Sequence, residues 1–243
     1  MFKLVIIKCF GLFLLTTYNI YAVEDKNTKL NFEILNNIYS DNSFTFFCGC
    51  EFRENGVNYQ KCSYYPKINN KNAHKIKWVK IIKMNDIIKN NTKLRKNNKK
   101  CINKNWGKRK KNKCVKQNKI ILLNTLKKDL HLVYPVISQI SKLTFNKDFK
   151  IINKEKRKFG ECDLEVNKRF VEPRDEIKGD IARLYKYVSV KYEKDNLITK
   201  KKDKLFNTWS KNDPADDWEC KRSEMIEKET GIVNPILKKL CKG

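Results

Sequence analysis

The sequence predicts a single α+β domain that is held together by disulfide bonds. Three observations support this fold class. About 220 residues follow an N-terminal leader, an ordinary size for one domain with a real core. Eight cysteines lie in those residues. Strand-like segments come first along this part of the chain, and helix-like apolar periodicity dominates its C-terminal part.

Residues 1–22 have the features of a signal peptide. Lys3 and Lys8 accompany a short apolar stretch, and the small Ala22 fits the residue before a signal-peptidase cut. An uncleaved anchor helix would need roughly 20 apolar residues without charge, so we favour cleavage. Nothing later is long and apolar enough to span a bilayer. We therefore expect a periplasmic or secreted protein with no membrane span once the leader is removed.

The charge of the chain indicates a polyanionic partner. The whole chain carries +27, and removal of Lys3 and Lys8 leaves +25. Such a field attracts nucleic acid, anionic lipid or acidic polymer. The general abundance of Lys, Asn and Ile is also typical of proteins from AT-rich genomes. Coding bias is thus an alternative source of part of this charge.

The elements expected first along the chain are short strands. Residues 23–43 form a polar N-terminal segment, and the domain proper runs from 44 to 243. Residues 44–47 look like a strand that enters a tight turn, and Glu54-Asn55-Gly56 is a hairpin signal with a return strand at 59–65. Residues 76–82 are apolar enough for a buried strand.

Residues 89–119 form a strongly basic run. The run holds 14 Lys or Arg in 31 residues, and no acid occurs between Asp86 and Asp129. We interpret it as a solvated loop tethered by Cys101 and Cys114. Either this run binds phosphates, or it is a solvated run of charge that has no function and is enlarged by coding bias.

Helices are expected in the rest of the chain. Residues 120–132 are apolar and helix-like, and apolar residues recur every 3 to 4 positions over 177–192. Another helix around 205–209 should stop at Asp213-Pro214. A last helical stretch, 218–241, should be interrupted near Gly231 and Pro235.

Cysteines predict a covalent frame. The eight that remain without Cys9 are Cys48, Cys50, Cys62, Cys101, Cys114, Cys162, Cys220 and Cys241. In an oxidising compartment they form up to four disulfides, with 105 possible pairings. Closeness in sequence favours Cys50–Cys62, Cys101–Cys114 and Cys220–Cys241, which would leave Cys48 with Cys162. A zinc site is disfavoured, since Cys48-Gly49-Cys50 is too tight for a CxxC knuckle.

Familiar catalytic motifs are missing from the sequence, but several blocks together match a known pattern. There is no P-loop, GxSxG, HExxH or EF-hand loop. The blocks are Thr45-Phe46-Phe47-Cys48-Gly49-Cys50, Asp129-Leu130-His131 with Pro135, Gly179-Asp180-Ile181-Ala182-Arg183-Leu184-Tyr185, Asp217-Trp218-Glu219-Cys220 and Asn234-Pro235. In this order, from about Phe44 to Cys241, they resemble the endonuclease I family of periplasmic and secreted bacterial nucleases. The resemblance implies a ββα-metal (His-Me finger) fold and Mg²⁺-dependent hydrolysis of DNA and often RNA.

The family reaction needs a histidine base, a glutamate and an asparagine that hold one Mg²⁺, and an arginine at the phosphate. The family's Glu-Trp-Glu-His aligns with Lys77-Trp78-Val79-Lys80, which puts Val79 in the metal-ligand slot and Lys80 in the base slot. Leu132 takes the asparagine slot of Asp-Met-His-Asn. The Gly-Glu-Val-Asn segment aligns with Ser138-Gln139-Ile140-Ser141. Arg109 is the expected counterpart of the arginine.

These substitutions predict impaired or lost catalysis, that is, a pseudoenzyme. Valine and leucine cannot coordinate Mg²⁺, so we expect none to be bound. The ammonium of Lys80 is no base near neutral pH unless its pKa is strongly lowered, and it would compete with the metal. It would instead grip a phosphate. The expected function is therefore non-sequence-specific binding of DNA or RNA by a monomer.

Further nucleic-acid contacts are expected from Arg109, Lys178, Arg183 and the basic run. The alternatives are an ion pair on the helix surface for Arg183 and plain solvation for Lys178. Two other functions stay open. One is a nuclease still active through a rearranged site, with His131 as base and Asp129 as ligand, although a lone histidine is more often structural. The other is a basic structural or interaction protein of the envelope.

Overall fold

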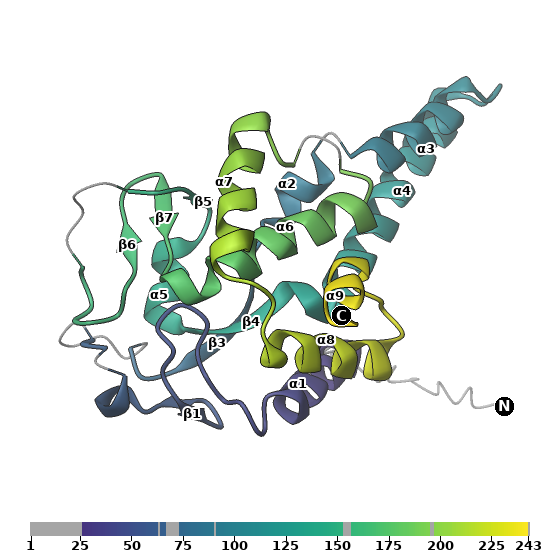
Figure 1. Ribbon diagram of the computed structural model, residues 1–243. Helices are drawn as coiled ribbons and strands as arrows, with labels where there is room; N and C mark the ends of the chain where they lie inside the picture. The colour runs from purple at the N-terminus through teal and green to yellow at the C-terminus, as the bar shows by residue number, and fades with distance from the viewer. Residues whose placement is uncertain are drawn as a thin grey trace, which may run out of the picture.

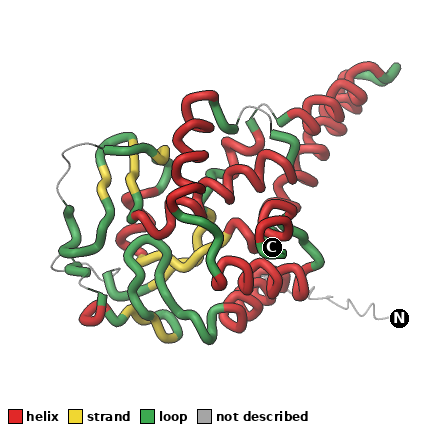
Figure 2. The backbone as a smooth tube through the Cα atoms, viewed as in Figure 1, coloured by secondary structure: helices red, strands yellow, loops and turns green. Residues whose placement is uncertain are grey.

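A computed structural model describes residues 26–62, 64–66, 73–89, 91–152, 157–194 and 197–242, with side chains from Phe32 onward. The expected signal peptide, 1–22, lies outside these residues. Helices gather on one side of the molecule and short strands on the other, and one helical hairpin extends away from the body (Figures 1 and 2). The structure confirms the single mixed α+β domain expected from the sequence.

The N-terminal segment contains a helix, which the polar composition of residues 23–43 did not predict. Helix α1 (Lys26–Ile38) places Leu35 and Ile38 in the hydrophobic core, together with Tyr39 just after it. Leu35 and Ile38 are three residues apart and therefore share one helix face. Burial of this narrow apolar face explains why an otherwise polar segment is helical.

A small hairpin follows α1. Strands β1 (Phe52–Arg53) and β2 (Gly56–Val57) pair antiparallel around a turn at Glu54 and Asn55, as the turn signal predicted. The return strand expected at 59–65 is wrong, because β2 is itself the return strand. A 3₁₀ helix, η1 (Tyr59–Lys61), comes next.

A strand–strand–helix unit forms the centre of the molecule. Strand β3 (Ile76–Lys80) pairs antiparallel with β4 (Val133–Ile137), and Lys80 lies opposite Val133. Every residue of β4 is buried. Helix α5 (Ser138–Thr144) follows β4 directly and packs on both strands. This unit confirms a strand within the expected segment 76–82, but the strand is not buried as expected: in β3 only Ile76 is buried, and Lys77 is exposed. Its open face forms one wall of the candidate site.

The basic run is helical, so the loop expected at 89–119 is wrong. Beyond the short helix α2 (Met84–Ile88), helices α3 (Thr92–Asn103) and α4 (Lys108–Lys128) form a hairpin that extends from the body (Figure 1). We call this hairpin the basic arm. The side chain of Asn91 caps α3 by accepting from the Leu94 N–H at 2.8 Å. Lysine has a good helix propensity, and a disulfide between Cys101 and Cys114 ties the two helices together.

The remaining elements complete the frame around the centre. Strands β5 (Asp148–Phe149), β7 (Phe170–Glu172) and β6 (Glu165–Val166) form a small sheet in that order. The 3₁₀ helices η2 (Leu130–Leu132) and η3 (Asp175–Ile177) precede β4 and α6. The C-terminal helices are α6 (Lys178–Lys191), α7 (Lys200–Asn212), α8 (Asp217–Thr230) and α9 (Pro235–Leu240).

The expected helix boundaries are confirmed in this C-terminal part. Helix α7 ends at Asn212, just before Asp213-Pro214. Helix α8 ends at Thr230, and Gly231 caps it with a φ of 68°, in the left-handed region that glycine adopts without penalty. Asn234 then caps α9 by accepting from two backbone N–H groups.

All four expected disulfides are present. They are Cys48–Cys162, Cys50–Cys62, Cys101–Cys114 and Cys220–Cys241. The Cys48–Cys162 bond joins segments 114 residues apart, whereas the other three close short loops. The covalent frame is therefore the one that the cysteine spacing favoured.

Candidate functional site

A groove of about 930 Å³ runs along strand β3 toward the end of helix α5. Its lining comes from β3 and the residues just after it, from the end of α5 and the turn beyond, and from α1 and Phe47. Among the described residues that line it there is no aspartate or glutamate. Five lysines line it, and we call it the lysine groove: Lys77, Lys80, Lys83, Lys142 and Lys147.

Lys80 lies at the end of β3, half-buried in this groove. Its Nζ donates to the carbonyl oxygens of Asp129 at 3.2 Å and Lys127 at 3.4 Å. Burial lowers the pKa of Lys80 to about 8, and the nearby carboxylate of Asp129 opposes this shift. Lys80 is thus charged below about pH 8, and its ammonium can hold a phosphate oxygen.

The residues at the family's magnesium slots do not fit a magnesium ion. Val79 lines the lysine groove, but Leu132 is fully buried, with its carbonyl accepting from the Ile81 N–H at 3.1 Å. In the segment aligned with Gly-Glu-Val-Asn, Ser141 lines the groove, whereas Gln139 is buried and accepts a hydrogen bond from Tyr64 at 2.7 Å. Mg²⁺ requires oxygen ligands, usually carboxylates. Within the described part of the chain, no three His, Cys, Asp or Glu side chains cluster as a metal site would require.

His131 and Asp129 do not form an alternative site. Both are buried, at 1% and 0% exposure, and neither lines the lysine groove. His131 Nε2 lies 2.8 Å from the carbonyl oxygen of Ile232, and burial lowers the pKa of His131. The Asp129 carboxylate accepts from the hydroxyls of Tyr187 at 2.7 Å and Tyr192 at 2.6 Å. Since neither side chain reaches solvent, the rearranged pair of base and ligand does not fit this geometry.

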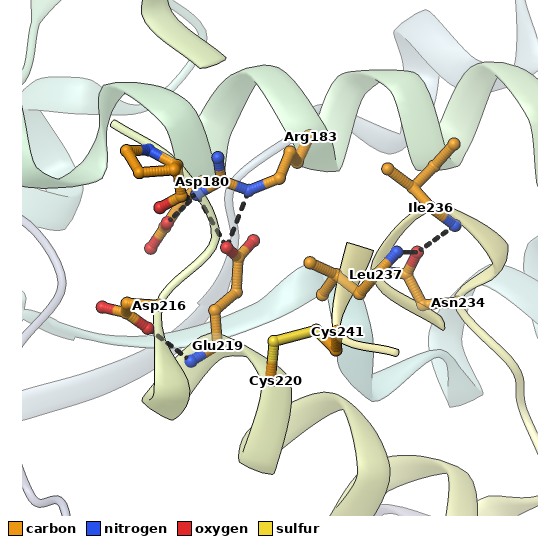
Figure 3. Close-up of a disulfide and its surroundings, with 10 residues drawn as sticks. Asp180, Arg183, Asp216, Glu219, Cys220, Asn234, Ile236, Leu237 and Cys241 are labelled. Carbon is orange, nitrogen blue, oxygen red and sulfur yellow. Dashed lines mark hydrogen bonds and ion pairs between the residues drawn. A yellow bond between two sulfur atoms is a disulfide. The ribbon is translucent and has the colours of Figure 1, made fainter. Parts of the chain in front are cut away.

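Arg183 is a buried residue that pairs with carboxylates inside the fold (Figure 3). This position contradicts the contact with nucleic acid expected for it. The side chain is 3% exposed. Its guanidinium contacts Glu219 at 2.7 Å and Asp180 at 2.8 Å, and it also donates to the carbonyl of Asp213. Burial raises the pKa of Glu219, whereas Arg183 lowers it. With its donors so engaged, Arg183 joins α6 to α8 and is not available to a phosphate.

Lys178 is also engaged by neighbouring carboxylates. Its Nζ lies 2.6 Å from Asp175 and 2.9 Å from Glu172, and its side chain is 16% exposed. Burial opposes the charge of Lys178, but the hydrogen bonds to these two carboxylates outweigh burial and raise its pKa. The plain solvation expected as an alternative is therefore also wrong, and Lys178 is a poor candidate for a phosphate contact.

Arg109 is exposed, but it lies far from the lysine groove. It belongs to the first turn of α4, at the outer end of the basic arm, whereas Lys127 at the other end of α4 contacts Lys80. An α-helix rises 1.5 Å per residue, so about 27 Å separates Arg109 from Lys127. This separation is too large for Arg109 and Lys80 to contact one phosphate group, so Arg109 does not fit its expected place as the counterpart of the family's arginine.

The groove also contains residues that sequence reasoning missed. Lys142 and Lys147 lie on either side of Phe145 at the end of α5, and Lys77 lies on β3. The spacing Lys142-Leu143-Thr144-Phe145-Asn146-Lys147 is visible in the sequence. Its significance depends on α5 folding back beside β3, which no local pattern indicates.

Comparison with known proteins agrees with the resemblance. Residues 22–241 match the family model described as Endonuclease I. The chain is 28% identical over 214 residues to an extracellular deoxyribonuclease of Aeromonas hydrophila, covering 85% of this chain and 87% of the relative. It is 26% identical over 238 residues to a periplasmic deoxyribonuclease of the same organism, covering 95% and 93%. An Endonuclease-1 of Buchnera aphidicola subsp. Acyrthosiphon pisum is 27% identical over 203 residues, covering 81% and 74%.

The match therefore spans both the strand–strand–helix centre and the disulfide-linked helices around it. In the described residues, no helix is both long and apolar enough to cross a membrane. The blocks from Thr45 to Cys241, the central unit and the full-length relatives all lead to one assignment. The chain belongs to the endonuclease I family.

Proposed function

We propose that this protein binds nucleic acid through the lysine groove and has lost the Mg²⁺-dependent hydrolysis of its family. One observation carries the proposal: Lys80 and Val79, which align with the family's base and a metal ligand, line the groove beside β3. Lysines line this groove in place of carboxylates. A groove of this composition attracts phosphate and repels a divalent cation.

Lys80 supports binding over hydrolysis by its position. A hydrolytic site must hold a water and remove its proton, and at neutral pH the ammonium of Lys80 has no lone pair for that proton. As a cation it attracts a phosphate oxygen without any metal. Lys77 and Lys142 extend this positive charge along the groove. The site is therefore suited to binding the phosphodiester backbone and not to cleaving it.

The basic arm supports a polyanionic partner as well. Lys104 and Lys110 lie 4.5 Å and 4.7 Å from the ring centroid of Trp106 at its tip. Neither α3 nor α4 contains an acidic residue. Contacts of this kind go to phosphates and carry no sequence information, so binding is expected to be independent of sequence.

We also propose that this protein shares the extracellular or periplasmic location of its relatives. Extracellular and periplasmic compartments are oxidising, and four disulfides suit such a compartment. We accordingly assign the protein to the periplasm or the exterior of the cell, as a monomer that meets nucleic acid there. Size-exclusion chromatography of the oxidised protein checks the monomer.

Binding without metal is the direct test. Fluorescence anisotropy with labelled DNA and RNA in EDTA should show salt-dependent binding, weakened about tenfold by Lys80→Gln. Lys204→Gln is the matched control, because Lys204 is an exposed lysine on α7 outside the groove. If the protein binds neither nucleic acid in EDTA, the proposal is wrong and the envelope interaction protein gains support.

Restoring the family residues tests the lost chemistry. A Val79→Glu, Lys80→His, Leu132→Asn variant should gain Mg²⁺-dependent nicking of plasmid if the frame is intact. Leu132 is fully buried, so its replacement needs a circular dichroism check that the fold survives. The Val79→Glu, Lys80→His double variant changes only groove residues and serves as the second arm.

A further inference from the structure

We infer that the lysine groove selects single-stranded nucleic acid over duplex, by stacking unpaired bases on Phe145 and Phe32. This inference rests on the proposed function and names the class of nucleic acid that the same groove takes. Two exposed phenylalanine rings line a groove whose other side chains include five lysines. That combination of cations for the backbone and flat rings for the bases is the one that single strands require.

Phe145 presents its ring to solvent at the end of α5. The residue is 72% exposed, the largest exposed fraction among the exposed large hydrophobic side chains of the described chain. Its backbone is fixed, because the Phe145 N–H donates to the carbonyl of Ser141 at 3.1 Å. Asn146 then turns the chain with a φ of 61°. The ring is thus held at the groove on a rigid support, which lowers the entropy that a stacked base would cost.

Phe32 supplies a second ring from a distant part of the sequence. It lies on helix α1, is 44% exposed and lines the same groove as Phe145. Exposed hydrophobic residues scattered singly over a surface are ordinary and need no explanation. Two aromatic rings that line one lysine-rich groove are not scattered. Of the described residues, no cation and no other ring packs on either of them.

The charges around Phe145 favour a phosphate on either side of the stacked base. Lys142 precedes the ring, and Lys147 follows it with its Nζ on the carbonyl of Lys168 at 2.9 Å. The acidic neighbours on this side are Asp148, which is 3.9 Å from Lys83 and 3.6 Å from Lys202, and Asp86, which is 3.9 Å from the same Lys83. Lys83 and Lys202 together offset these two carboxylates, which leaves the charges of Lys142 and Lys147. The surroundings of Phe145 remain net positive.

Duplex nucleic acid does not satisfy this groove. Bases in a duplex are already stacked and paired, so their faces are closed to a protein ring unless the base is extruded at a cost of a few kcal/mol. An unpaired base meets the ring directly. Base–aromatic stacking tolerates any sequence, because every base has a π-face. Single strands of either DNA or RNA should consequently bind, without base specificity.

The experiment compares two labelled oligonucleotides by anisotropy in EDTA. One is an oligo-dT of roughly 12 nucleotides, a length within the usual site sizes, and the other is a duplex of the same length. The unmodified protein should prefer oligo-dT. Phe145→Ala should weaken oligo-dT binding about tenfold, leave duplex binding within about twofold, and keep the salt slope, since stacking releases no counterions. Phe145→Tyr should restore oligo-dT affinity.

Phe44→Ala is the matched control, because Phe44 is 52% exposed and lies outside the lysine groove. Equal loss for oligo-dT and duplex, or no loss for either, would overturn the inference while the proposed function stands. If the unmodified protein binds neither oligonucleotide, both the inference and the proposed function are wrong.

Discussion

The C-terminal helices and the lysine groove treat charge in opposite ways. Around α6 and α8, Arg183 is buried and paired with Glu219 and Asp180 (Figure 3). In the groove, Lys77 and Lys142 are exposed, and among the described residues the Nζ of Lys80 contacts backbone carbonyls and no carboxylate. Lys83 is the exception, since its Nζ lies 3.9 Å from Asp86 and from Asp148. In the first region the charged side chains pair with one another inside the fold. In the second, Lys77, Lys80 and Lys142 have no carboxylate partner among the described residues and can contact an external anion.

This difference separates fold from chemistry. The blocks that match the family around Arg183 and Trp218 make contacts inside the fold: Arg183 pairs with Glu219 and Asp180, and Trp218 packs on Tyr39. Loss of these contacts would destabilise the domain. The slots at Val79, Lys80 and Leu132 hold residues that the fold accepts but that suit no magnesium. The frame can therefore persist when its catalytic residues are replaced, which is the basis of our proposal that the groove binds nucleic acid without cutting it.

The largest expected effect is on the stability of the frame. Glu219→Ala would leave the buried guanidinium of Arg183 without its main carboxylate, and should lower the free energy of unfolding by about 3–5 kcal/mol. Urea unfolding followed by circular dichroism measures the change. Glu224→Ala, an exposed position on the same helix, is the control and should stay within about 0.5 kcal/mol. A loss below about 1 kcal/mol for Glu219→Ala would refute the structural role.

The next largest effect is expected as a difference in stability between loss of the Cys220–Cys241 disulfide and loss of the Cys101–Cys114 disulfide. Replacing Cys220 and Cys241 by serine frees α9 from α8, and should cost about 2–4 kcal/mol in global unfolding. Replacing Cys101 and Cys114 should leave the global free energy nearly unchanged, because α3 and α4 pack mainly on each other. In the variant that lacks the Cys101–Cys114 disulfide, amide hydrogen exchange should be faster only in the basic arm. Equal effects on global unfolding would show that the arm belongs to the core.

A pH titration sharpens the account of Lys80. Its pKa is lowered to about 8, so its charge is present below that pH and is lost as the pH rises through it. Affinity for oligo-dT should thus fall several-fold from about pH 7 to about pH 9, well below the usual lysine pKa of about 10.4. Lys80→Arg stays charged throughout and should remove the decline. A decline of the same size in Lys80→Arg would locate the titrating group elsewhere.

The smallest expected effect is at the end of the basic arm. Arg109→Ala removes one exposed cation and should lower duplex affinity by only about twofold to threefold. The slope of log K against log salt should fall by about 0.9, as for one phosphate contact. Anisotropy over a series of salt concentrations gives both values. An unchanged slope would mean that Arg109 meets no phosphate.

Much of the frame was predictable from local patterns. Apolar residues every 3 to 4 positions fixed α6, the Asp213-Pro214 and Gly231 signals gave the helix ends, and short cysteine spacings favoured three disulfides. Two stretches expected to be non-helical, residues 26–38 in α1 and residues 92–119 in the basic arm, form polar or lysine-rich helices, whereas the helix-like segment expected from residue 120 is the second half of α4. Their helicity comes from a narrow packed face at Leu35 and Ile38, from the Asn91 cap and from the Cys101–Cys114 bond.

The candidate site was predictable only in part. Motif alignment located Val79 and Lys80, and both line the groove. It could not show that Arg183 is buried, because the exposure of a helix residue depends on which partner covers it, and Glu219 is 36 residues away in sequence. Phe32 lies on α1, well before the central unit in the sequence, whereas Phe145 follows α5 directly. Their meeting in one groove follows from tertiary packing that no local pattern specifies.

Plasmid nicking tests the central claim most directly. The purified oxidised protein is incubated with supercoiled plasmid, once with Mg²⁺ and once with EDTA, and the products are resolved by agarose electrophoresis. We predict intact supercoiled DNA in both conditions, with retarded mobility that disappears at high salt. Nicking that occurs with Mg²⁺ and is abolished by EDTA would contradict the account.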